Sequence, residues 1–169
     1  MMGTSENTLD SQHPSGAAIS AKEVARGVSR LFARNDIWCL PEVALKNNRR
    51  ADLMGIDAKG LLVIVEIKVA RGDLLSDTKW PDYLDFCDRF FWAVPPGFDR
   101  APLNGEAFQP GETGVIVADG YDAEIVRHAA LTRLAPARRK AQVERLARFA
   151  MRRHTALIDP QCADIDTHG

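Results

Sequence analysis

The chain has 169 residues, of which 46% are hydrophobic, and a formal net charge of −1. This is the size and composition of one globular domain with a substantial core. A net charge near zero excludes a polyelectrolyte-type binder, so any nucleic-acid surface must come from a local concentration of cations. Three widely spaced cysteines without a CxxC pair predict reduced thiols and neither a disulfide framework nor a zinc site. Without a membrane-length apolar run or a signal pattern, we expect a cytoplasmic protein that does not bind membranes.

The two ends of the chain are polar. They predict a disordered N-terminal tail over residues 1–18, a single domain over residues 19–154 and a C-terminal tail over residues 155–169. The domain begins with Ser20-Ala21-Lys22-Glu23, a capping-box pattern in which Ser20 caps a helix and Glu23 closes the box. We expect this helix to run to about Ala33.

Three strands should follow this helix. Residues 37–45 read as the first strand, and Pro41 within it predicts a sheet edge or a bulge. Residues 50–54 and 61–68 flank a segment rich in turn formers, so we expect them to pair as an antiparallel hairpin. The second of these, LLVIVEIK, opens with five aliphatic residues, which is typical of a strand buried on both faces.

Charged side chains gather where this hairpin opens. Glu66 and Lys68 point to the same face because side chains alternate along a strand. A turn near the middle of the connecting segment puts Asp52 opposite Val65 or Glu66, so two carboxylates and a lysine meet at one point. Hard oxygen ligands of this kind suit Mg²⁺, and the amine can orient a water or a phosphate. Glu42 interrupts an apolar strand; either it faces solvent or it joins these carboxylates, and we favour the second.

The middle of the chain should complete the sheet. Residues 73–88 predict two short helical pieces bent at Pro81, with Asp73 as a cap. A core strand over residues 89–94, a surface loop over 99–112 and a hairpin of residues 114–119 and 123–127 are expected next. Four aspartates make the helical pieces acidic, and most of them should form a solvated face directed away from any nucleic acid: Asp77, Asp82, Asp85 and Asp88.

A basic helix should end the domain. Pro136 suits its first turn, and the segment to His154 carries seven cations and one glutamate, a local charge of +6. One interpretation is a surface that follows a phosphate backbone, and the other is a solvated helix offset by acidic patches elsewhere. We favour the nucleic-acid interpretation.

The spacing around the hairpin resembles a known nuclease core. Asp52, thirteen intervening residues and Glu66-Ile67-Lys68 resemble the D…ExK motif of the PD-(D/E)XK nuclease superfamily, with Ala51 in place of the usual proline. The wider segments LPEVALKNNRRADLMGID and VEIKVARGDLLSDTKWPDYLDFCDRFFWAVP resemble the bacterial MmcB-type DNA-repair proteins. This resemblance covers roughly residues 21–127, most of the chain.

The resemblance implies an α/β fold with a restriction-endonuclease-like core, a central mixed sheet flanked by helices and the basic C-terminal helix. It implies that Asp52, Glu66 and the Ile67 backbone carbonyl hold Mg²⁺ or Mn²⁺, with Lys68 as a catalytic residue beside them. Glu42, or Glu23 where the superfamily often has a helical glutamate, is a further candidate ligand, although capping alone also explains Glu23. Residues expected to contact nucleic acid are Arg49, Arg50, Lys79, Tyr83, Arg145, Arg148 and Arg152. Of these, Arg50 is open to a second interpretation, an ion pair with a site carboxylate, and Lys79 and Tyr83 stand where related nucleases carry a QxxxY-like pattern.

The leading hypothesis is therefore a metal-dependent deoxyribonuclease that hydrolyses DNA phosphodiester bonds during repair. The first alternative is a catalytically silent DNA-binding module of the same fold. A second is an interaction protein whose acidic helix docks a partner. The sequence leaves open which DNA structure is bound, whether the protein forms a homodimer and which repair proteins it contacts.

Overall fold

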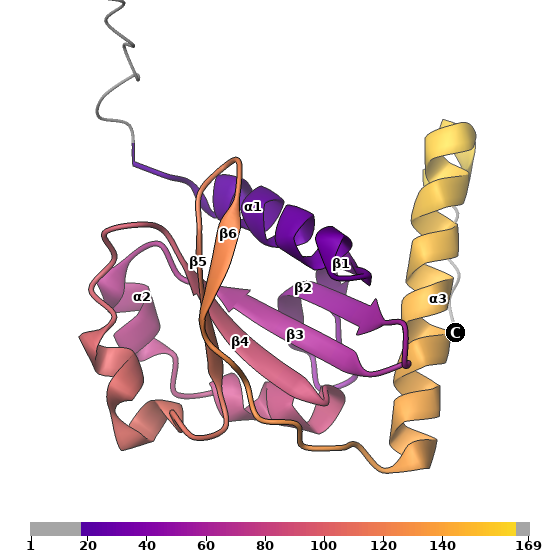
Figure 1. The fold of residues 1–169 in the computed structure, drawn as a ribbon. Helices are drawn as coiled ribbons and strands as arrows, with labels where there is room; N and C mark the ends of the chain where they lie inside the picture. The colour runs from indigo at the N-terminus through magenta and orange to yellow at the C-terminus, as the bar shows by residue number, and fades with distance from the viewer. Residues whose placement is uncertain (1–17, 165–169) are drawn as a thin grey trace, which may run out of the picture.

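A six-stranded mixed sheet in the order β1-β2-β3-β4-β5-β6 forms the centre of the computed structural model, which describes residues 18–164 (Figure 1). Strands β3, β4 and β5 run parallel, and the other neighbours are antiparallel. The strands are β1 (Ile37–Ala44), β2 (Arg50–Asp57), β3 (Leu62–Ile67), β4 (Arg89–Val94), β5 (Gly114–Ala118) and β6 (Ala123–Arg127). The α-helices are α1 (Ala21–Arg34), α2 (Arg71–Ser76) and α3 (Pro136–Ile158). The 3₁₀ helices are η1 (Trp80–Phe86), η2 (Ala101–Asn104), η3 (Glu106–Phe108) and η4 (Pro160–Asp164).

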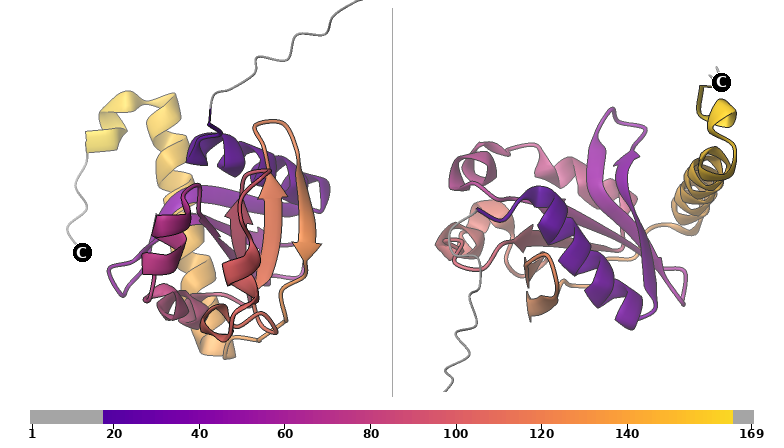
Figure 2. Two further views of the ribbon diagram at one scale, coloured as in Figure 1. Left: turned by 90° about the vertical axis from the view of Figure 1, so that its left-hand side faces the viewer. Right: turned by 90° about the horizontal axis from the view of Figure 1, so that it is seen from above.

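Each face of the sheet has its own core. Helix α1 packs Val24, Val28 and Phe32 against one face. The other face carries a larger aromatic cluster that includes Trp80 and Trp92, and α3 adds Leu146 to it. The two perpendicular views show α1 and α3 lying against different parts of the sheet (Figure 2). The predicted α/β class, with a central mixed sheet flanked by helices, is confirmed, and this arrangement is consistent with a restriction-endonuclease-like core.

The local predictions for α1, β1 and the β2–β3 hairpin are confirmed. The capping box forms as expected, because the Ser20 side chain accepts from the Glu23 backbone N–H and the Glu23 carboxylate accepts from the Ser20 backbone N–H. Strand β1 is an edge strand, which accommodates Pro41. Strands β2 and β3 form the predicted antiparallel hairpin, with a turn over residues 58–60 where Gly60 has a φ of 75°.

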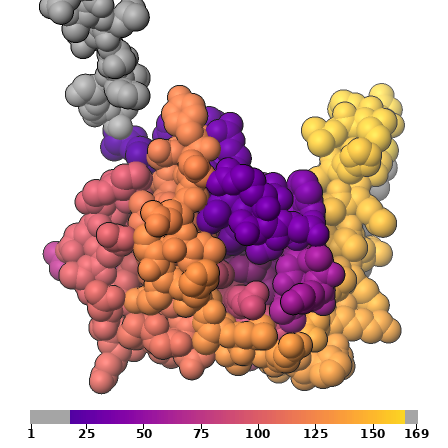
Figure 3. Space-filling model, in the orientation of Figure 1, coloured from indigo at the N-terminus to yellow at the C-terminus, as the bar shows by residue number. Residues whose placement is uncertain are grey.

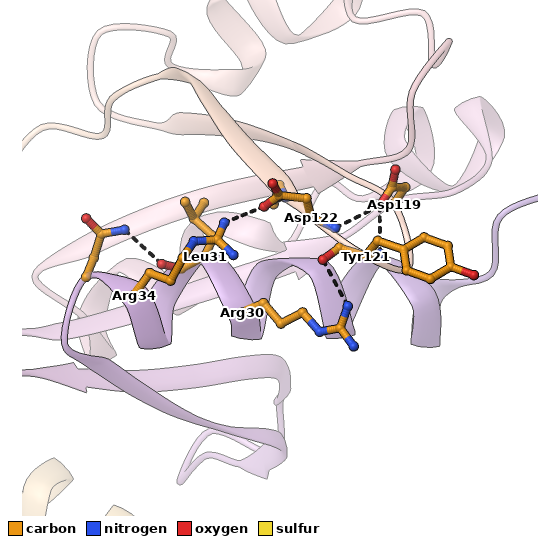
Figure 4. Close-up of polar contacts among 8 residues, drawn as sticks. Arg30, Leu31, Arg34, Asp119, Tyr121 and Asp122 are labelled. Carbon is orange, nitrogen blue, oxygen red and sulfur yellow. Dashed lines mark hydrogen bonds and ion pairs between the residues drawn. The ribbon is translucent and has the colours of Figure 1, made fainter.

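The loop between β5 and β6 is fastened to α1 (Figure 4). Arg30 Nη1 donates to the backbone carbonyl of Tyr121 at 3.0 Å, and Arg34 pairs with Asp122. Helix and loop approach so closely at Gly27 that a Cβ there would lie 2.6 Å from the Asp122 carbonyl oxygen. A glycine is therefore required for this contact.

Helix α3 lies at the β1 side of the sheet. Its C-terminal part, yellow in Figure 3, projects from the rest of the domain. The predicted C-terminal tail is wrong for residues 155–164, because α3 continues to Ile158 and η4 follows. The predicted Asp73 cap is also wrong: α2 begins earlier, with Ala70 as N-cap, and Asp73 lies in its first turn. The remainder of the predicted tails, residues 1–17 and 165–169, lies outside the described residues. No helix within residues 18–164 is long and apolar enough to cross a membrane.

Candidate active site

The hairpin of β2 and β3 opens at two carboxylates. Its last backbone pair joins Leu53 to Val65, so the same register puts Asp52 opposite Glu66, within the range that the sequence predicted. Beyond this pair, backbone N–H groups of the two strands donate to side-chain carboxylates. Glu66 Oε1 accepts from the Asp52 backbone N–H at 3.2 Å, and Asp52 Oδ2 accepts from the Ile67 backbone N–H at 2.7 Å. Each carboxylate is thus held by the strand that carries the other.

Burial makes this pair electrostatically unusual. Glu66 is only 4% exposed, and Asp52 is partly buried. Desolvation, together with the adjacent charge of Asp52, raises the pKa of Glu66 to about 8. Desolvation also raises the pKa of Asp52, against the opposing effect of the Ile67 N–H. Two acidic groups with raised pKa values in contact are typical of a functional site.

Lys68 lies next to the pair but is held by another residue. Its Nζ donates to Asp77 Oδ2 at 2.7 Å, and the two side chains are 13% and 16% exposed. The ammonium also lies over the Trp92 ring, 5.8 Å from its centroid. The sequence placed Asp77 on a solvated face directed away from the substrate. That prediction is wrong, because the segment between α2 and η1 turns Asp77 inward toward Lys68.

The Asp52–Glu66 pair fits a divalent cation. Within the described part of the chain, no three His, Cys, Asp or Glu side chains converge as a metal-binding group. Mg²⁺, however, is commonly held by one or two carboxylates and keeps several waters. The pair is buried, the charge of Asp52 disfavours ionisation of Glu66, and the two cations that act on the pair, Lys68 and Arg50, are bound to Asp77 and Glu42 instead. Asp52 and Glu66 are therefore the side chains that would hold the metal.

A family model described as DNA repair protein MmcB-like matches residues 7–161. The chain belongs to this family. A solved structure, that of a protein of unknown function from Silicibacter pomeroyi, shares 40% sequence identity with a TM-score of 0.74 over 88% of this chain and 94% of that one. No curated protein matches the chain. Membership of the MmcB-like family supports a role in DNA repair.

Glu42 and Glu23 do not complete a ligand set in this MmcB-like protein. The register puts Glu42 opposite Asp52 on the β1 side, but its backbone is left-handed at a φ of 52°. Its exposed carboxylate pairs with Arg50 at 3.2 Å, which is one of the two roles expected of that arginine. Glu23 lies on α1, which packs on the face opposite the Trp92 cluster, and its carboxylate accepts from Ser20. The capping function is thus the one that the contacts show.

Some of the residues near the site that were predicted to contact nucleic acid are exposed, and others are buried or already bound to another side chain. Arg49 is exposed enough to reach a ligand but already binds Asp82, with its Nη2 3.0 Å from the carboxylate. Lys79 is exposed, whereas Tyr83 is buried and its hydroxyl donates to the Arg50 carbonyl at 3.1 Å. Lys79 is the N-cap of the 3₁₀ helix η1, and Tyr83 lies within that helix with its side chain buried. Burial, with Glu66 and Asp52 nearby, raises the pKa of Tyr83.

Several cations of α3 fasten the helix to the sheet. Arg139 pairs at 2.5 Å with Asp88, a carboxylate whose side chain is 0% exposed and which the sequence wrongly placed on a solvated face. Arg153 donates to the carbonyls of Pro41 and Glu42. The MmcB-like chain therefore uses part of its basic segment for folding.

A groove on α3 retains the cationic character that the sequence indicated. It has a volume of about 750 Å³ and is lined by Lys46, Arg145, Arg148 and Arg152, together with Phe149 and Met151. Arg145 donates to the Ala44 carbonyl at 3.0 Å, so its guanidinium is anchored at the groove's edge.

Proposed function

We propose that this MmcB-like protein is a metal-dependent deoxyribonuclease of the PD-(D/E)XK type that acts in DNA repair. The observation that carries the proposal is the buried pair of Asp52 and Glu66, held by reciprocal backbone hydrogen bonds and followed on the same strand by Lys68. With both groups ionised, this pair would cost stability, because burying charge without a counter-ion is unfavourable. A bound divalent cation would offset that cost.

Each residue has a defined part in phosphodiester hydrolysis. Asp52 and Glu66 would hold Mg²⁺ or Mn²⁺, with the Ile67 backbone carbonyl as a further ligand. The bound metal would neutralise charge on the phosphate and lower the pKa of an attacking water. Lys68 orients that water and stabilises negative charge on the phosphate. Glu66 gives up its proton when it becomes a ligand, because its pKa is about 8 without metal. Metal binding should therefore release protons and strengthen as pH rises.

The groove on α3 is the proposed surface for the DNA backbone. Its lining includes the cations Lys46, Arg145 and Arg148 beside a single acidic residue, Glu144, and α3 contacts the β1 residues that neighbour Asp52. A local excess of lysine and arginine of this kind favours binding to a phosphate backbone. Sequence-independent contacts of this kind are what a nuclease acting on varied repair substrates requires.

A silent DNA-binding module is the second candidate, and two observations favour it. Lys68 is bound to Asp77, and the described residues supply only the two carboxylates. Such a protein would bind DNA through the same groove without cleaving it.

The test is a panel of single-stranded, duplex, flapped and branched DNAs incubated with Mg²⁺ or Mn²⁺. Wild type is compared with Asp52→Asn and Lys68→Ala, and circular dichroism checks that each variant folds. Lys59→Ala, which removes an exposed lysine from the β2–β3 turn, is the matched control and should cleave like wild type. Cleavage that both site variants lose supports the nuclease. Cleavage retained by Asp52→Asn or Lys68→Ala rules out this site, and DNA binding without cleavage by wild type establishes the silent module.

A further inference from the structure

Three carboxyl groups interact electrostatically with one ammonium at the end of β3. Asp52 and Glu66 lie on the sheet, and Asp77 reaches in from the segment between α2 and η1. The charge of Lys68 influences both Asp52 and Glu66, so all three acids lie within electrostatic reach of it. Of the three, Asp77 makes the direct contact, at 2.7 Å.

The position of Asp77 is fixed by α2. Its backbone N–H donates to the Leu74 carbonyl at 3.3 Å, and Leu74 is fully buried in the core. The Trp92 ring also lies under the Lys68 ammonium, 5.8 Å from it, and Trp92 is itself fully buried. The ammonium is therefore held by two anchored groups, a carboxylate and the face of an indole, both of which attract a cation.

This arrangement determines whether the Lys68 ammonium or a divalent cation binds the Asp52–Glu66 pair. A buried ammonium without a partner is costly, so Lys68 released from Asp77 would turn to the nearest remaining carboxylate. An ion pair with Glu66 or Asp52 would supply the counter-ion that the pair lacks and would compete directly with a divalent cation. The contact with Asp77 removes that competitor.

We propose that Asp77 is a positioning residue of the metal site, which keeps the Lys68 ammonium off the Asp52–Glu66 pair and so leaves both carboxylates to a divalent cation. The inference rests on the proposed function, since it concerns the same pair. The effect of Asp77 on metal binding differs from a general charge effect, because it acts through Lys68. It should therefore vanish when the Lys68 amine is removed.

The experiment measures Mn²⁺ affinity of the full chain by calorimetry, without DNA. Asp77→Asn should bind Mn²⁺ about 10–100-fold more weakly than wild type, the range found for residues that support metal ligands. Asp99→Asn is the matched control, because it makes the same change of charge at an exposed pair with Arg71, and it should bind like wild type.

A double-mutant cycle with Lys68→Met distinguishes positioning from charge. Methionine keeps an apolar stem against Trp92 but has no amine. In that background the Asp77→Asn change should no longer weaken Mn²⁺ binding. An equal loss in both backgrounds would mean that Asp77 acts only as a nearby charge, and the inference would be overturned.

Glu66→Gln separates this inference from the proposed function. If Glu66→Gln loses Mn²⁺ binding while Asp77→Asn binds as wild type does, the metal site stands and the role of Asp77 is refuted. If Glu66→Gln binds as tightly as wild type, or wild type does not bind Mn²⁺, the metal site itself is refuted together with the inference.

Discussion

Replacing Glu66 with glutamine should stabilise the folded protein at alkaline pH. The ordinary pKa of a glutamate is 4.5, and the folded environment raises that of Glu66 to about 8. Between these pH values the folded state keeps a proton that the unfolded state has lost. The free energy of unfolding therefore falls as pH rises through this window, and above about pH 8 the wild type carries a buried charge.

The magnitude follows from the size of that change. At 1.36 kcal/mol for each pH unit, a group moved from 4.5 to about 8 costs on the order of 3–5 kcal/mol at pH 9. Glutamine has no charge to bury, and its carbonyl oxygen can still accept from the Asp52 N–H. The variant should thus avoid this cost while it keeps the packing of the site.

Urea unfolding at pH 5, 7 and 9 with a chelator present measures the effect. We expect the free energies of unfolding of the variant and wild type to agree within about 1 kcal/mol at pH 5 and to diverge as pH rises. In thermal unfolding under the same conditions, the variant should melt about 6–20 °C higher at pH 9. Glu124→Gln, at an exposed position on β6, should follow the wild type throughout. A Glu66→Gln variant that is no more stable than wild type at pH 9 would refute the reasoning.

Three further changes test other parts of the structure. Asp88→Ala should lower the free energy of unfolding, measured in urea, by about 3–5 kcal/mol, because two backbone N–H groups and a guanidinium lose a buried acceptor. Asp85→Ala, which removes an exposed ion pair, is the control and should have little effect. Gly27→Ala should lower the free energy of unfolding by about 1–3 kcal/mol, since the new Cβ would meet a backbone oxygen at 2.2 Å. A Cβ at Gly72 would meet nothing within 4 Å, so Gly72→Ala should not destabilise the protein in thermal unfolding. Arg148→Glu should weaken DNA binding and reduce the slope of affinity against salt by about 1–2, and an unchanged slope in a salt titration would exclude this groove as the DNA surface.

Local patterns in the sequence determined the framework of the site. The alternation of side chains and the turn formers before Leu61 were sufficient to place Asp52 within one residue of its observed partner, Glu66. The capping box at Ser20 and the edge position of β1 were likewise predictable. Each of these features depends on residues close together in the chain or on the fixed geometry of a hairpin, so a short stretch of sequence carries the information.

The tertiary structure alone decided the partners of the acidic residues Asp77 and Asp88. Asp77 and Asp88 read as members of one solvated acidic face, yet the fold pairs the first with Lys68 and the second with Arg139. Tyr83 is likewise buried by the fold, because it lies in a 3₁₀ helix that packs against the core. The burial that raises the pKa of Glu66 comes from elements distant in the chain that pack around β3. Side-chain partners and desolvation depend on this packing, which no local pattern encodes.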